Sequence, residues 1–84
     1  MRVEILTPET TVFTEENAAV VQLPAIDGYF EILNNHAPMI TVLGTGNAKI
    51  IDNNNETHHF DIAGGVVEVL TNKVLVLAEK CTQK

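Results

Sequence analysis

The sequence is poor in cysteine and proline and contains no serine, and these shortages narrow what the chain can be. Cys81 is the only cysteine, so no disulfide can form within the chain, which fits a reducing compartment. Three prolines and a hydrophobic fraction of 45% argue for a folded chain. No nucleophile, base and orienting acid come together in the sequence. An enzyme is therefore the weakest functional hypothesis.

Positive charge is also scarce. Five Lys and Arg stand against eleven Asp and Glu, which gives a net charge of −6. Binding to nucleic acid needs clustered cations that displace counterions, and adhesion to an anionic membrane needs the same. No apolar run approaches the ~20 residues that span a bilayer. The composition thus argues against nucleic acid and against direct membrane contact.

Short alternating runs dominate the chain, and no stretch keeps a helical period for three turns. Turn signals recur every ~8–12 residues, as in β-sandwiches and barrels. A chain of 84 residues makes one domain. We therefore expect a single all-β domain over residues 1–84, with about ten short strands. The expected strands cover residues 2–7, 11–13, 18–23, 29–33, 39–43, 47–51, 57–62, 66–70 and 73–77.

Residues 28–43 hold the most specific residue order, two apolar runs around Asn35-His36-Ala37-Pro38. Asparagine tolerates positive φ and suits a tight turn. We expect His36 to hydrogen-bond the backbone of its own turn or of a partner. A metal ion would need three or four ligands, and His58 and His59 point to opposite faces of a strand. The sequence predicts no metal site.

Two glycine pairs invite comparison with phosphate-binding loops. Residues 44–49 lack the required spacing and lead into a strand instead of a helix, so we interpret Gly44-Thr45-Gly46 as a turn. Gly64-Gly65 interrupts an alternating run, as expected for a bulge or bend.

The last expected strand is apolar on both faces, with Val74 and Val76 on one side and Leu75 and Leu77 on the other. Such a strand is either covered on both sides or pressed against another protein. The sequence therefore favours an interaction module. One hypothesis is a free-standing β-sandwich that binds a protein or a small ligand.

Two segments resemble the epsilon subunit of F-type ATP synthases, called delta in mitochondria. The first is residues 28–41, with Ile32 and then His36-Ala37-Pro38-Met39-Ile40-Thr41. The second is residues 60–79, with Gly64-Gly65-Val66-Val67-Glu68-Val69 and the closing strand 74–79. The opening residues 3–13 also fit, so the resemblance covers essentially the whole chain.

This resemblance implies a flattened β-sandwich in the central stalk of the rotor, linking the gamma subunit to the membrane c-ring. Such a subunit helps couple proton or sodium translocation to ATP synthesis, is not itself catalytic, and holds no cofactor in this domain. It lies on the cytoplasmic face of the bacterial plasma membrane and touches the membrane only through its partner subunits. The implied ring-facing residues are Tyr29, Phe30, Glu31, Ile32, Asn34, Asn35 and His36. The implied gamma-facing residues are Thr7, Met39, Thr41 and Ala63.

The sequence departs from the family pattern in two places. Family members commonly have Gly-Glu at Gly28-Tyr29, Gly at Glu31 and Pro-Gly at Asn34-Asn35, so the turn here is built from asparagine. Most bacterial relatives continue into a C-terminal helical hairpin that can inhibit ATP hydrolysis. Because Lys84 comes just after the closing strand, we expect a short subunit without that hairpin.

Overall fold

The computed structural model describes all residues, Met1–Lys84, and contains strands and turns but no helix. Seven strands form one sheet in the order β2-β1-β7-β6-β5-β3-β4. Neighbouring strands pair antiparallel except β1 and β7, which run parallel. The strands are β1 (Arg2–Leu6), β2 (Thr11–Glu15), β3 (Ala18–Ala25), β4 (Gly28–Leu33), β5 (Met39–Asp52), β6 (Thr57–Leu70) and β7 (Lys73–Gln83).

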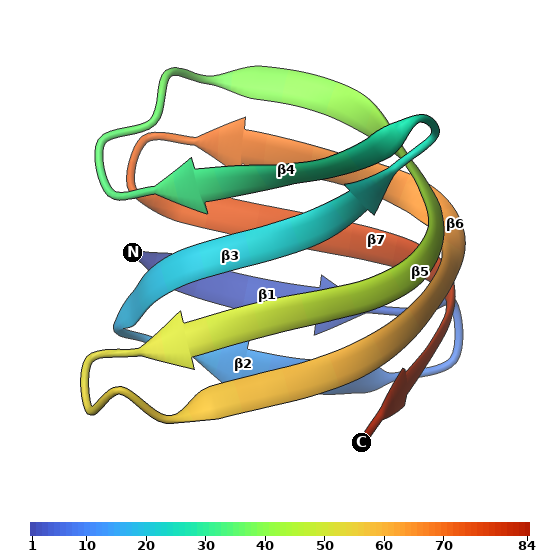
Figure 1. Cartoon of the computed structure of the whole chain (residues 1–84), viewed down its shortest axis with the longest axis horizontal. Coiled ribbons are helices and arrows are strands. Elements are labelled where there is room, and N and C mark those ends of the chain that lie inside the picture. The colour runs from blue at the N-terminus through green and yellow to red at the C-terminus, as the bar shows by residue number, and fades with distance from the viewer.

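The sheet folds back on itself into two layers, because its three longest strands curve from one layer into the other (Figure 1). The first part of β5, the second part of β6 and the first part of β7 lie with β1 and β2. The remaining parts of these strands lie with β3 and β4. This confirms the all-β sandwich, with seven strands in place of about ten, since each long strand accounts for segments that the sequence suggested were separate.

Glycines mark the bends within β5 and β6. Gly44-Thr45-Gly46 was expected as a turn, and that expectation was wrong, because β5 continues through it with an unbroken register against β6. Gly64 and Gly65 have φ of 74° and 135°, which confirms a bend at this pair. A Cβ on Gly65 would lie 2.2 Å from the carbonyl oxygen of Leu77, so only glycine lets β7 pass this closely.

The core fills the space between the layers with 17 buried hydrophobic residues. Alternate residues of each strand supply it, as the period of two requires. Phe60 is fully buried at its centre, and its ring meets that of Phe13 edge-on at 4.9 Å. No helix of the structure is long and apolar enough to cross a membrane.

Candidate functional site

One outer side of the sandwich exposes apolar side chains that the chain itself does not cover. We call this the outer face and define it by the outward side chains of β5, β6 and β7 in the layer that contains β1. Its five exposed members are Ile40 (69% exposed), Val42 (55%), Val66 (36%), Leu70 (41%) and Leu77 (44%). A contiguous apolar patch of this kind on a folded domain is typical of a protein-binding surface.

Strand register brings these side chains together. Val42 of β5 pairs with Val66 of β6, and Val66 pairs with Leu77 of β7, so the three form one row across the sheet. In β7, Val74 and Val76 are buried, whereas the alternate side chains point outward. The sequence left two alternatives for this strand, coverage on both sides or contact with another protein. The structure shows that the chain leaves the outward side of β7 uncovered.

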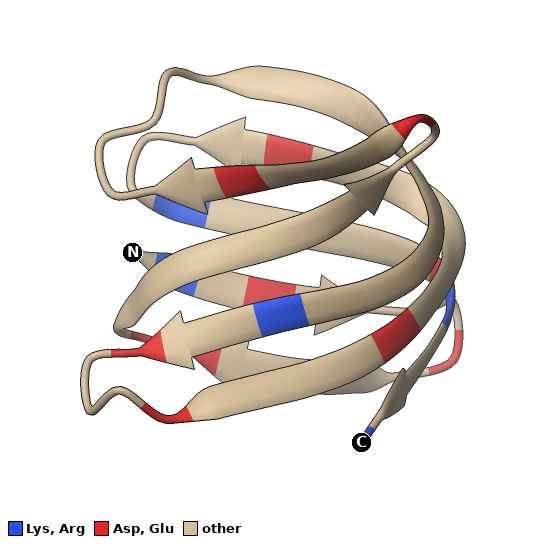
Figure 2. Ribbon diagram, viewed as in Figure 1, with Lys and Arg blue, Asp and Glu red and all other residues tan.

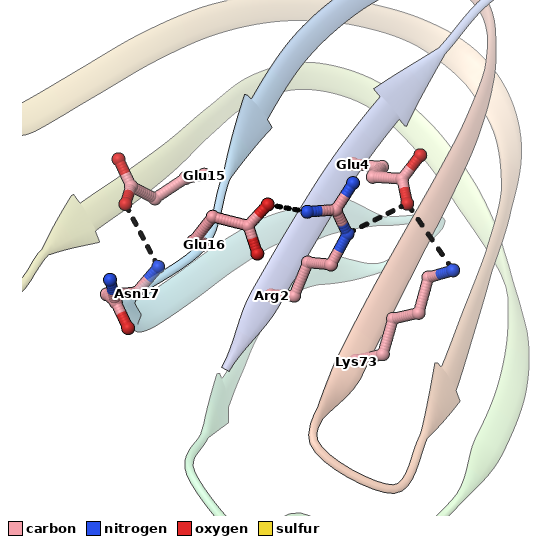
Figure 3. A network of polar contacts seen from close by, with 6 residues as sticks. All are labelled: Arg2, Glu4, Glu15, Glu16, Asn17 and Lys73. Carbon is pink, nitrogen blue, oxygen red and sulfur yellow. Dashed lines mark hydrogen bonds and ion pairs between the residues drawn. The ribbon is translucent and has the colours of Figure 1, made fainter.

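A charged network borders the outer face on the β1 side (Figure 3). Oε1 of Glu4 accepts hydrogen bonds from Nε of Arg2 at 3.1 Å and pairs with Nζ of Lys73 at 3.3 Å. Arg2 also pairs with Glu16. The hydrogen bond from Arg2, followed by that from Lys73, lowers the pKa of Glu4 below its usual value. These charges satisfy one another within the chain.

Two hollows lie at opposite borders of the outer face. The first is lined by Leu6, Thr7, Pro8, Leu77, Ala78 and Glu79. The second is lined by Pro38, Met39, Ile40, Glu68, Val69 and Leu70. Thr7 and Met39, two of the residues that the resemblance suggested for the gamma contact, therefore line these hollows, although the side chain of Met39 points inward and packs partly against the core.

The other two suggested gamma contacts lie elsewhere. Thr41 pairs with the buried Val67 of β6, so its side chain points to the inward side of the sheet, where it keeps partial exposure. Ala63 pairs with Thr45 and lines a separate hollow with Cys81. The structure does not gather the four residues into one patch. The sequence analysis did not identify Ile40, Val42, Val66 and Leu70 as a contact surface. Alternation along β5 and β6 was the signal that could have found them.

The loop after β4 has the conformation expected of its residues. Asn35 adopts a positive φ of 66°. Nδ1 of His36 lies 2.7 Å from the carbonyl oxygen of Ala37, so the imidazole donates to the backbone of its own turn, as predicted. Oδ1 of Asn34 accepts a hydrogen bond from the backbone nitrogen of Met1 at 2.9 Å. The loop is therefore held by one contact within the turn and by one long-range contact with Met1.

The residues suggested for the ring contact divide into two groups along β4. Tyr29 is 58% exposed at the start of the strand, next to Ile26, which is 78% exposed and was not predicted. Asn34 comes five residues later, roughly 17 Å away for an extended strand. Asn34, Asn35 and His36 therefore form a second group, on the loop.

Between these groups, β4 alternates. Glu31 points outward, whereas Phe30 is half-buried and packs against the core. Ile32 is fully buried opposite Val21. The suggestion that Ile32 faces a partner is thus wrong for its side chain, because strand alternation turns that side chain into the core.

A polar cluster that the sequence analysis missed closes one open end of the sandwich. Ligand-type atoms of Glu15, Asp52 and His58 all lie within 4.8 Å of one another. Oδ1 of Asp52 accepts from the backbone nitrogens of Asn54 and Glu56, and its Oδ2 lies 3.1 Å from Nε2 of His58. These contacts engage both carboxylate oxygens of Asp52, so the cluster is explained by its role in stabilising the β5–β6 hairpin.

Two distant segments, β2 and the β5–β6 hairpin, supply this cluster, and no spacing in the sequence indicates it. The contact with His58, followed by the backbone hydrogen bonds, lowers the pKa of Asp52. His59 points to the opposite side, where its Nδ1 lies 3.3 Å from Oδ1 of Asn47, which confirms that the two adjacent histidines diverge. Burial, with the nearby carboxylate of Asp61, raises the pKa of the Cys81 thiol.

The fold and these surfaces define an all-β sandwich domain with an uncovered apolar face. The comparison with known proteins is specific: residues 1–84 match the family described as ATP synthase, Delta/Epsilon chain, beta-sandwich domain. The chain belongs to this family. It is 42% identical over 76 residues to the ATP synthase epsilon chain of Maridesulfovibrio salexigens, covering 90% of this chain and 52% of the relative. It is 33% identical to that of Chlorobium limicola, covering 93% and 88%.

The share of each relative that the chain spans varies. It spans 62% of the epsilon chain of Desulfosudis oleivorans and 50% of that of Protochlamydia amoebophila. Among solved structures, a chain of the Euglena gracilis mitochondrial ATP synthase superposes with a TM-score of 0.89 at 16% identity, covering 96% of this chain and 51% of that chain. A chain of the Tetrahymena thermophila enzyme gives 0.83 at 21%, covering 98% and 65%. These likenesses support the fold.

Proposed function

We propose that this chain is a non-catalytic subunit of the central stalk of an F-type ATP synthase, linking the gamma subunit to the c-ring and helping couple ion translocation to ATP synthesis. The family match over residues 1–84 carries this proposal. Two solved structures that share this fold support it, since one is of an assembly with a c-ring and the other is of a central stalk with its c-ring. The same match weighs against a free-standing binding module. We also propose that residues 1–84 act as one domain.

The outer face is the proposed contact with gamma. Covering the row Val42, Val66 and Leu77 would remove apolar surface from water, at about 25 cal/mol for each Å² buried. Thr7 and Met39 line the hollows at its borders and would lie at the edge of the contact. A subunit held by such a contact would be peripheral to the membrane, on its cytoplasmic face in a bacterium.

The His36 loop and the start of β4 are the proposed contacts with the c-ring. Asn34, Asn35 and His36 present polar groups at one end of β4, and Tyr29 and Glu31 present theirs along it. Polar side chains suit a contact with the polar loops of a membrane ring. Coupling would follow from holding gamma on one surface and the ring on another.

Binding to gamma tests the proposal directly. The chain is titrated into the gamma-type subunit encoded in the same genome, and the complex is followed by size-exclusion chromatography and calorimetry. Val42→Asp together with Leu77→Asp should weaken the complex at least tenfold, because charge is placed in the apolar contact. Asn53→Asp together with Asn54→Asp, at the exposed tip of the β5–β6 hairpin, adds the same charge away from the outer face, serves as the matched control and should bind normally. Wild-type protein that fails to bind gamma refutes the proposal.

A further inference from the structure

Glu68 is a charged side chain among the apolar residues of the outer face, and Lys73 is a cation on the same face. It lies on β6 between the outward residues Val66 and Leu70, and it is partly exposed. Register places Ile40 of β5 on one side of it and Leu75 of β7 on the other. Its carboxylate therefore projects between two apolar neighbours in the row across the sheet, with Lys73 on the diagonal.

Nothing in the chain pairs with this carboxylate. Glu68 takes part in none of the five ion pairs of the structure. The nearest cation by register is Lys73, which sits diagonally across β6 and β7 and pairs instead with Glu4 at 3.3 Å. The few basic residues are spread over the molecule, while acidic residues occur on both layers (Figure 2). Glu68 is solvated only as long as the outer face is open.

A partner that covers the outer face would also take water away from Glu68. Burying an ionised carboxylate without a counter-charge is costly, and the cost is offset only by a cation or hydrogen-bond donors in good geometry. The hollow beside Glu68, lined by Met39, Ile40 and Leu70 among others, has room for an incoming side chain with an apolar stem. Lysine and arginine have such a stem and a cationic end.

We infer that the surface that docks on the outer face carries a lysine or arginine that enters this hollow and pairs with Glu68. The inference rests on the proposed contact with gamma and specifies its chemistry: an apolar patch with a single cation. The apolar row would supply contact area, and the Glu68 pair would fix the register of the two surfaces. An apolar surface without a cation, or one with an acidic side chain at this point, would be rejected.

The test compares Glu68 with an acid outside the face. Affinity for the gamma-type subunit is measured for Glu68→Gln, Glu68→Lys and the control Glu56→Gln, which makes the same charge change at the exposed tip of the β5–β6 hairpin. We expect Glu68→Gln to raise Kd about tenfold or more, Glu68→Lys to raise it further, and Glu56→Gln to change it less than twofold. Thermal unfolding confirms that each variant is folded.

A charge swap identifies the partner residue. Single Lys→Glu and Arg→Glu variants of gamma are screened against Glu68→Lys, and one of them should recover at least tenfold of the lost affinity. Glu68→Gln that binds as tightly as wild type, or more tightly, overturns the inference while the contact with gamma stands. The same holds if no gamma variant rescues Glu68→Lys. Wild-type protein that does not bind gamma removes the proposed function as well.

Discussion

Oδ2 of Asp52 lies 3.1 Å from Nε2 of His58, and this contact joins the two strands of the β5–β6 hairpin where the sandwich opens to solvent. Asp52 is 8% exposed, and its other oxygen caps two backbone nitrogens of the hairpin. The ring of His58 in turn lies 5.0 Å from that of Phe13 on β2. One carboxylate thus connects the hairpin to both layers.

Acid should weaken the fold partly through Asp52. Its pKa is lowered in the folded state, so its contribution to the free energy of unfolding is present above its unfolded pKa of 3.8 and disappears as pH falls through the folded value. Asp52→Asn cannot titrate, so its stability should fall less between pH 5 and pH 2.5 than that of wild type. Urea midpoints at the two pH values measure this. Equal losses in both proteins would contradict it.

Glu4 provides a second, independent acid-sensitive site. Its pKa is lowered by the hydrogen bond from Arg2 and then by that from Lys73, so the sign is the same. Because Glu4 points outward from β1 and shares no partner with Asp52, the effects of Glu4→Gln and Asp52→Asn on the urea midpoint should add. Clear non-additivity at pH 5 would show that the two sites communicate.

Gly28 and Gly65 are two of the three glycines with positive φ, and Gly65 should be the less replaceable of the two. An alanine at Gly65 would bear backbone strain of about 1–3 kcal/mol and an overpacking cost of about 1–3 kcal/mol, because its Cβ would meet the carbonyl of Leu77. At Gly28, φ is 148° and nothing lies within 4 Å, so Gly28→Ala bears the strain alone. Denaturant unfolding of the two variants separates backbone strain from overpacking. A similar loss of unfolding free energy in both would exclude a clash with the carbonyl of Leu77 as the cause.

Phe60 should be the most costly single truncation in the core. It is fully buried and touches Phe13, and Phe→Ala changes at such sites cost about 3–5 kcal/mol. That is a large share of the stability of a domain of this size, at ~0.05–0.15 kcal/mol per residue. Tyr29→Ala, an aromatic truncation at a 58% exposed position, is the matched control and should cost far less. Urea denaturation compares the two.

Local sequence signals predicted strand content and turn chemistry well. Asn55 and Asn72 adopt φ of 64° and 58° in the turns between expected strands, after residues 47–51 and 66–70. Alternation correctly put His58 and His59 on opposite sides of β6. These features depend on residues close in sequence, whose φ preferences and period of two act without regard to the rest of the fold.

Features that depend on contacts between distant parts of the chain could not be predicted from the sequence in the same way. Gly44 and Gly46 carry a normal turn signal, yet β5 runs through them because β6 pairs with β5 before and after Gly44 in the same register. The cluster of Glu15 with Asp52 and His58 depends on closure of the two layers, which no local pattern encodes. The ring-facing list failed at Ile32 because a family alignment transfers position and not side-chain direction.

Asn35 should separate the two proposed docking surfaces. Its backbone is held at φ 66°, a conformation that aspartate also tolerates, so Asn35→Asp adds a negative charge to the loop without refolding it. If the loop faces the c-ring, attachment of the gamma complex to the ring should weaken, while affinity for gamma, whose proposed contact lies on the outer face, should stay within twofold. Asn54→Asp, at the tip of the β5–β6 hairpin, supplies the control for added charge. Pull-down on c-ring in detergent and calorimetry with gamma measure the two affinities, and an equal loss of both would place the loop on the gamma surface instead.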